Sequence, residues 1–215
     1  MKIDFVSDVS CPWCAIGLSS LQVALERIGP ELPVELHFQP FELNPRMAPE
    51  GEDTTEHLAK KYGIGEAEIA RNREHIRARG AAVGFTFDMA ARARIYNTFD
   101  AHRLLHWAET QGEGRQLALK KALLQAYFTD GQDPSSHDVL VRYAERVGLD
   151  GAKAREVLAC GAYATDVRDA EQYSQQRGIH SVPSVIIDDK HLIQGGQPPE
   201  VFEQALRQLA ANPAA

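Results

Sequence analysis

Two short segments near the start of the chain alternate between hydrophobic and polar residues, and a helix-like segment lies between them. Ile3 and Phe5 alternate with Lys2 and Asp4, Val6 continues the apolar pattern, and residues 34–38 alternate throughout. A period of two places every second side chain on one face of a β-strand, whereas the apolar positions of residues 15–28 recur at helical spacing. The pattern predicts a strand, a helix and a second strand, which together form a βαβ unit.

The middle of the chain has the periodicity of helices. A turn-rich stretch, residues 44–51, follows the second predicted strand, and apolar residues then recur mostly at helical spacing as far as about residue 178. We therefore expect an inserted part that is almost wholly helical. Its helices are predicted to open at Thr54 and near Asn97, and to span 115–128, 138–147, 152–158 and 163–176.

Strand signals return in the last part of the chain. Residues 181–187 form a β-branched run, residues 191–193 follow after a short polar turn, and the two segments are close enough to form a hairpin. An amphipathic helix over residues 200–209 ends the pattern. The order βαβ, helices, ββα predicts an α/β fold with a large all-helical insertion. The predicted bounds are 1–43 with 179–215 for one discontinuous domain and 44–178 for the insertion.

Composition and charge exclude several classes of protein. The 215 residues are 44% hydrophobic, enough for a substantial core, and the formal net charge of −7 disfavours a surface for nucleic acid or anionic lipid. No run of about eighteen apolar residues is present, so we expect no membrane-spanning helix. The chain enters its first predicted strand at once, without the basic and apolar regions of a secretory signal, which predicts a cytoplasmic protein.

Two cysteines lie where the first predicted strand meets the first predicted helix. Cys11 and Cys14 are separated by Pro12 and Trp13, and proline is favoured at the first position of a helix. The unpaired N–H groups and the dipole of a helix N-terminus favour a thiolate over a thiol there. The motif therefore predicts a redox pair. A metal half-site and two inert buried thiols are the alternatives, but zinc needs four ligands and the third cysteine, Cys160, is isolated.

Other reactive or aromatic side chains have structural interpretations. His102 and His106 are four residues apart on a predicted helix, but no third ligand has a recognisable spacing, so we predict a capped or solvent-facing pair and no metal site. Cys160 is interpreted as a structural thiol, and a regulatory or intermolecular thiol is the alternative. Trp107 is expected in the core, whereas Trp13 suits either contact with a substrate or packing on the helical insertion.

Charged residues are dense between residues 66 and 79. This segment contains four arginines together with several glutamates, in a chain that is acidic as a whole. Mixed charges of this kind are typical of a solvated helix face. We therefore predict no binding role for the segment.

Five motifs give the chain a resemblance to a known family. With these motifs and the order of its elements, the chain resembles the DsbA-like branch of the thioredoxin fold, and most closely its cytoplasmic FrnE-type thiol-disulfide oxidoreductases. The resemblance covers nearly the whole chain. The motifs are Asp8-Val9-Ser10-Cys11-Pro12-Trp13-Cys14-Ala15-Ile16-Gly17, Phe41-Glu42-Leu43-Asn44-Pro45, Tyr96-Asn97-Thr98-Phe99-Asp100-Ala101-His102-Arg103-Leu104, Val182-Pro183-Ser184 and Gly195-Gly196-Gln197-Pro198-Pro199-Glu200.

The resemblance implies roles for the residues that carry chemistry. Cys11 matches an exposed nucleophile and Cys14 matches the resolving thiol. Pro183 matches a cis-proline whose loop faces the dithiol, where the backbone of Val182 can pair with an extended substrate chain. The implied activity is thiol-disulfide exchange through a mixed disulfide, on proteins or small molecules that contain disulfides.

The resemblance also bears on cofactors and partners. It implies no resident cofactor, with glutathione as a candidate reductant or co-substrate. The expected partners are disulfide-containing proteins or small thiols, without nucleic acid or membrane, and helical insertions in this fold often offer an apolar face that suits a homodimer. The dipeptide Pro12-Trp13 belongs to the active-site motif but differs from the dipeptide of thioredoxin and from that of the strongly oxidising periplasmic enzyme.

Two other classes of function stay open at this point. Glutathione transferases of the kappa class and 2-hydroxychromene-2-carboxylate isomerases are related, but they carry serine at the position of Cys11. The third class is a non-enzymatic chaperone or binding module in which the cysteines are incidental. The redox hypothesis predicts that Cys11→Ser loses activity, whereas the binding module predicts that it does not.

Overall fold

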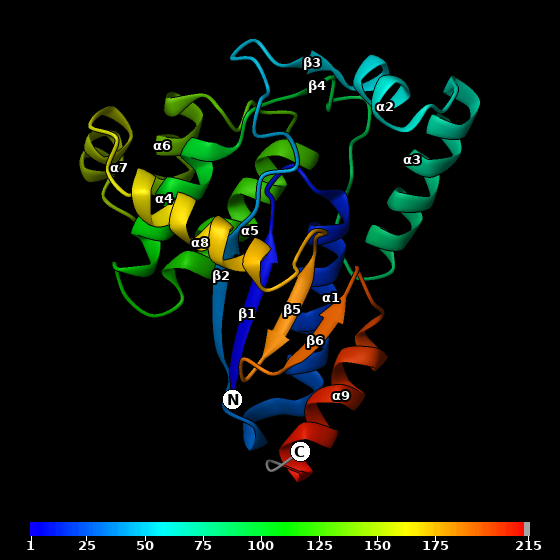
Figure 1. Ribbon diagram of the computed structural model, residues 1–215, viewed down its shortest axis with the longest axis vertical. Coiled ribbons are helices and arrows are strands. Elements are labelled where there is room, and N and C mark those ends of the chain that lie inside the picture. The colour runs from blue at the N-terminus through cyan, green and yellow to red at the C-terminus, as the bar shows by residue number, and fades with distance from the viewer. Residues whose placement is uncertain (213–215) are drawn as a thin grey trace.

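A four-stranded mixed sheet lies at the centre of the protein (Figure 1). The computed structural model describes residues 1–212. Strand β2 runs parallel to β1, and the other neighbouring strands are antiparallel, so β1 joins an N-terminal βαβ unit to a C-terminal hairpin. In the order in which they lie in the sheet, the strands are β2 (Glu35–Pro40), β1 (Lys2–Ser7), β5 (Ser184–Ile187) and β6 (His191–Gln194).

Helices cover both faces of this sheet. Helices α1 (Pro12–Ile28) and α9 (Pro199–Ala211) lie on one face, and α8 (Ala164–Gln176) crosses the other (Figure 1). The alternation along β1 accounts for the two layers, because Ile3 and Phe5 are fully buried in the main core with residues of α1 and α9. Each such side chain contributes about 1.5–3 kcal/mol by leaving water. The intervening positions of β1 face α8.

The segment between β2 and β5 is mostly helical, as predicted. It also contains a two-stranded antiparallel ladder. Outside this segment, a short 3-10 turn, Gly29–Glu31, follows α1. In chain order the elements of the insertion before α8 are β3 (Glu52–Asp53), α2 (Thr54–Tyr62), α3 (Glu66–Ala81), β4 (Arg94–Ile95), α4 (Phe99–Glu109), α5 (Arg115–Phe128), α6 (His137–Arg146) and α7 (Gly151–Ala159).

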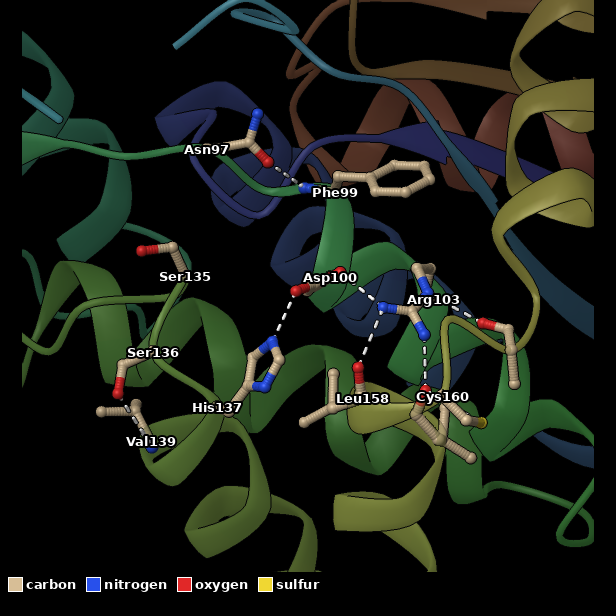
Figure 2. Close-up of polar contacts among 12 residues, drawn as sticks. Asn97, Phe99, Asp100, Arg103, Ser135, Ser136, His137, Val139, Leu158 and Cys160 are labelled. Atoms are coloured by element: carbon tan, nitrogen blue, oxygen red, sulfur yellow. Dashed lines mark hydrogen bonds and ion pairs between the residues drawn. The ribbon is translucent and has the colours of Figure 1, made fainter. Parts of the chain in front are cut away.

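A buried arginine fixes helices α4, α6 and α7 of the insertion relative to one another. Arg103 on α4 is 4% exposed, and its guanidinium donates to three backbone carbonyl oxygens at the end of α7 and just beyond it (Figure 2). These carbonyls lack partners within a helix, so the arginine satisfies them. Asp100 accepts from the same guanidinium at 2.6 Å and lies 2.6 Å from His137 Nε2 on α6.

The predicted fold class is confirmed, namely an α/β thioredoxin-like fold with a helical insertion between its strands. The sequence pattern does not separate α3 from α2, and it does not predict the β3–β4 ladder. The division into two domains stays a prediction. Leu124, Tyr127 and Phe128 of α5 pack into the same core as the sheet, so the insertion and the rest of the chain share part of one core. Residues 213–215 of the predicted first domain lie outside the described residues. Within residues 1–212, no helix is both long enough and apolar enough to span a membrane.

Candidate active site

The Cys-Pro-Trp-Cys motif lies at the start of α1, as predicted. Cys11 is the N-cap residue, and its carbonyl oxygen accepts from the N–H groups of Cys14 at 3.1 Å and Ala15 at 3.3 Å. Pro12 is the first helical residue, where the absence of an N–H removes no hydrogen bond. The Cys11 side chain makes no capping hydrogen bond to the backbone of the helix that it opens.

The two free thiols occupy different environments. Cys14 is completely buried, and burial raises its pKa well above the usual value, as do its hydrogen bond and charge interaction with Cys11. Cys11 is 4% exposed and lines a cavity. The resemblance implied an exposed nucleophile, and this expectation is wrong because Cys11 is almost completely buried. The elements around α1 cover it except on the side of this cavity.

The loop before β5 faces the dithiol. The Val182–Pro183 peptide bond is cis, and the carbonyl oxygen of Val182 lies 3.7 Å from Cys11 Sγ, which can donate to it. Gly17 on α1 permits this close approach, because a Cβ at that position would lie 3.1 Å from Pro183 Cγ. The fold thus brings together two motifs that are about 170 residues apart in the sequence.

Asp8 anchors the loop that leads from β1 to Cys11. It is fully buried, and its carboxylate accepts from Ser10 N at 3.1 Å, from Ser10 Oγ at 2.9 Å and from Leu43 N at 2.7 Å. His102 Nε2 lies 3.5 Å from Asp8 Oδ1. Burial raises the pKa of Asp8, but the interaction with His102 and the backbone donors outweighs it and lowers the pKa to about 2. Asp8 thereby ties the active-site loop to the segment after β2.

A buried cation acts on the thiol of Cys14. Lys120 on α5 is 1% exposed, and its Nζ lies 5.9 Å from the centroid of the Phe38 ring. Burial lowers the pKa of Lys120, while the negative charges of Cys14, Asp8 and Cys11 oppose that shift. In return, the positive charge of Lys120 lowers the pKa of Cys14 and so counteracts part of the effect of burial. Lys120 is therefore placed to favour the Cys14 thiolate.

We expect Lys120→Met to slow the attack of Cys14 on a mixed disulfide by about tenfold and to move its pH dependence to higher pH. Methionine keeps an unbranched stem in the core but removes the charge that favours the Cys14 thiolate. Rapid-quench measurement of mixed-disulfide decay against pH checks this. The control is Lys121→Met, which changes an exposed neighbour and should leave the decay rate unaltered. An unshifted pH profile in Lys120→Met would contradict the assigned effect.

A cavity of about 530 Å³ opens beside Cys11, between the motif and helices α2 and α3. Lys61, Arg73 and Arg92 line it, with Glu68 as an opposing carboxylate. Arg92 is 9% exposed, and its Nε is buried without a hydrogen-bond partner in the part of the chain that the structure describes. A cavity of this size with an excess of cations suits a small molecule that carries carboxylates.

Trp13 packs on the helical insertion. Its ring lies 5.5 Å from the ring of His75 in an edge-on arrangement, and the guanidinium of Arg79 lies 5.8 Å from its centroid. Trp13 also lines the cavity beside Cys11. The packing interpretation is thus observed, and contact with a substrate stays a prediction.

Several interpretations from the sequence are corrected by the structure. His102 is 3% exposed beside Asp8, so the solvent-facing pair is wrong, and His106 instead lies 5.2 Å from the ring of Tyr163. Cys160 lies at the end of α7 (Figure 2). It is exposed, so its interpretation as a structural thiol is also wrong. Trp107 is buried in the core, as predicted.

The charged segment between residues 66 and 79 is not only a solvated helix face. Arg73 lines the cavity and donates to Thr55 Oγ1 at 2.8 Å, and Arg79 contacts Trp13.

Within residues 1–212, no group of three or more His, Cys, Asp or Glu side chains is arranged to hold a metal ion.

Comparison with known proteins decides the family. The model of the DSBA-like thioredoxin domain matches residues 2–207, which is nearly the whole chain. The chain belongs to the DsbA-like thioredoxin family. A probable DsbA oxidoreductase from Streptomyces coelicolor, itself a solved structure, is 34% identical to this DsbA-like protein. It has a TM-score of 0.88, and the match covers 99% of this chain and 91% of that one.

Two further relatives of this DsbA-like protein differ in how much they share with it. The uncharacterized protein YwbO of Bacillus subtilis (strain 168) is 28% identical over 207 residues, which is 96% of each chain. The cytosolic disulfide reductase DsbM from Pseudomonas aeruginosa, solved with GSH, has a TM-score of 0.67 at 15% identity and covers 98% of this chain and 100% of its own. At that identity the likeness to DsbM shows the fold alone.

Proposed function

We propose that this protein is a thiol-disulfide oxidoreductase of the FrnE type that reduces small, negatively charged disulfides through Cys11 and Cys14. The observation that carries the proposal is the position of Cys11. Its sulfur lies at the N-terminus of α1, beside the carbonyl oxygen of Val182 and on the wall of a cavity with an excess of cations. A thiolate is the nucleophile in disulfide exchange, and Cys11 is the thiol of the pair that reaches the cavity.

The proposed reaction has two exchange steps. The Cys11 thiolate attacks one sulfur of the substrate, the substrate S–S bond breaks, and one half leaves as a thiolate that takes a proton from water. The other half stays bonded to Cys11. Cys14 loses its proton, attacks Cys11 Sγ and releases the second half, leaving a Cys11–Cys14 disulfide. Two electrons have passed from the dithiol to the substrate, and two equivalents of a small thiol other than the released product then restore the dithiol and leave joined as their own disulfide.

The cavity favours small anionic substrates over proteins. Three cations stand against one carboxylate on its lining, and its volume of about 530 Å³ lies within the range of small-molecule pockets. Glutathione disulfide carries four carboxylates and has a sulfur that Cys11 can attack. The structure of DsbM with GSH, a protein of the same fold, supports glutathione as a candidate.

Disulfide reduction by the purified, reduced protein tests the proposal. We expect turnover of glutathione disulfide about tenfold faster than that of the uncharged bis(2-hydroxyethyl) disulfide at low salt, with the difference shrinking as salt screens the cations. Turnover of no disulfide above the level of Cys11→Ser would contradict the proposal. Conjugation of glutathione to an electrophile such as 1-chloro-2,4-dinitrobenzene, without disulfide reduction, would favour the transferase class instead.

The direction of electron flow follows from the reduction potential of the dithiol. We propose that the protein works as a reductase in the cytoplasm, where a pool of small thiols would restore the dithiol. Titration of the Cys11–Cys14 pair against glutathione measures the potential. A value near that of thioredoxin, about −270 mV, supports a reductase, whereas a value near −120 mV indicates an oxidant.

A further inference from the structure

Arg79 links helix α3 to the loop between β6 and α9, across the active-site motif. Its Nη2 donates to the carbonyl oxygen of Gly196 at 2.9 Å, between positions 117 residues apart in the sequence. The same guanidinium lies over the ring of Trp13 at 5.8 Å, and His75, one turn earlier on α3, contacts that ring at 5.5 Å. We call the contacts of Arg79 with Gly196 and Trp13 the Arg79 clasp.

The ring of Trp13 separates two hollows of the surface. Trp13 and Val182 line both the cavity beside Cys11 and a more open groove on the outer side. Cys11 lines the cavity but not the groove, whereas Arg79 and Gly196 line the groove but not the cavity. Trp13 is therefore the wall between the outer groove and the nucleophile, and the Arg79 clasp holds that wall in place.

The loop on the other side of Trp13 packs as closely as the chain allows. A Cβ at Gly196 would lie 3.0 Å from the carbonyl oxygen of Trp13 and 3.2 Å from Trp13 Cε3. The absence of a side chain at Gly196 thus lets this loop pack directly against Trp13. Arg79 joins the same loop to α3. An extended protein segment that lies beside Val182 in the outer groove is separated from Cys11 by the ring of Trp13.

We propose that Arg79 determines substrate specificity, because its clasp leaves Cys11 open to small disulfides in the cavity and closes it to disulfides of bulky proteins. The inference rests on the proposed function and names the residue that limits its substrates. A charge-assisted hydrogen bond and a cation–π contact are individually modest interactions, so the wall opens at times in the native protein. Loss of both contacts should increase the open fraction about fivefold to twentyfold.

Alkylation of Cys11 tests the clasp without any disulfide substrate. In a Cys160→Ser background, which removes the exposed third thiol, the reduced protein reacts with N-ethylmaleimide or with a maleimide on a 5-kDa polyethylene glycol. We expect Arg79→Ala to raise the rate of the large reagent relative to the small one by about fivefold or more. The matched control is Arg77→Ala, on the same helix, which removes an exposed arginine that pairs with Glu74. This control should leave the ratio unchanged.

Reduction kinetics give the second readout. Arg79→Ala should raise kcat/KM for insulin several-fold while kcat/KM for glutathione disulfide stays within about twofold. Arg79→Met keeps an apolar stem against Trp13 but cannot donate to Gly196, and it should change both readouts in the same direction. An unchanged ratio in both Arg79 variants, or an equal change in Arg77→Ala, would overturn the inference. If the wild type reduces no disulfide, the proposed function fails, and the alkylation ratio still decides whether the clasp exists.

Discussion

We expect Cys11→Ser to abolish disulfide reduction, with kcat/KM lowered by more than about 10³-fold. A serine hydroxyl is not ionised near neutral pH and cannot form the mixed disulfide, so both exchange steps are lost. The fold should survive, because serine differs from cysteine by one atom and Cys11 makes no capping hydrogen bond. Turnover of glutathione disulfide by the variant and by wild-type protein, each checked by its urea midpoint, provides the measurement.

The Cys14→Ser variant should fail at a different step. Cys11 can still attack the substrate, but nothing displaces the bound half, so one glutathionyl group accumulates per protein. Intact-mass measurement detects this adduct, and reducing agent should remove it. Cys160→Ser serves both as a background, so that the exposed thiol cannot carry the adduct, and as a control that should reduce disulfides at the wild-type rate. An adduct that fails to form in Cys14→Ser, Cys160→Ser would remove the roles assigned to the two active-site thiols.

The sequence was sufficient for the fold because each element of the central sheet has a local signal. Alternation along residues 34–38 and the β-branched run of residues 181–187 indicated strands, and Pro12 and the helical spacing after it indicated where α1 begins. The loop that faces the dithiol, which contains Val182–Pro183, could be identified only through the resemblance. No periodicity links residues 11 and 182, whose contact depends on the pairing of β1 with β5.

Helix α3 was not delimited because it has almost no buried face. Ile69 and Gly80 are its buried residues, and the charged side chains between them leave no apolar stripe at helical spacing. The periodicity of apolar residues indicates which face of a helix is buried. A helix that covers an active site from outside buries few side chains, so its apolar periodicity is weak. For the same reason the segment was interpreted as solvated, although it supplies Arg73 to the cavity and Arg79 to Trp13.

Asp8 and Lys120 were missed as site residues for different reasons. Asp8 stands in the active-site motif itself, but its partner Leu43 belongs to the segment after β2, and only the folded chain brings them together. Lys120, in contrast, has a local signal in the sequence. It lies on the same helical stripe as the buried residues Leu123 and Leu124, and a lysine on a buried stripe is costly unless charges nearby favour it.

Asp8→Asn should lower the free energy of unfolding by about 2 kcal/mol at neutral pH. The native pKa of Asp8 is lowered from 3.8 to about 2, so the folded state holds its carboxylate ionised more strongly than the unfolded chain does. The amide keeps the size of the side chain, but its NH2 group replaces either Oδ1, which accepts from Ser10 N, or Oδ2, which accepts from both Leu43 N and Ser10 Oγ. Urea unfolding of both proteins measures the loss.

The pH dependence of this difference identifies the carboxylate as its cause. A lowered pKa gives stability that is fully present above the unfolded value of 3.8 and disappears as the pH falls towards 2. Glu42 and Glu171 have raised pKa values, caused mainly by burial, and act in the opposite direction. Both residues are present in both proteins, and only the smaller contribution of the Asp8 charge to the raised pKa of Glu171 differs between them. The difference between wild type and Asp8→Asn should therefore be constant above about pH 5 and shrink below pH 4.

The control is Asp138→Asn, which changes a carboxylate with 84% of its side chain exposed and should stay within about 0.5 kcal/mol of wild type throughout. A loss in Asp8→Asn that persists unchanged at pH 2 would show that packing, rather than the ionised carboxylate, anchors the active-site loop.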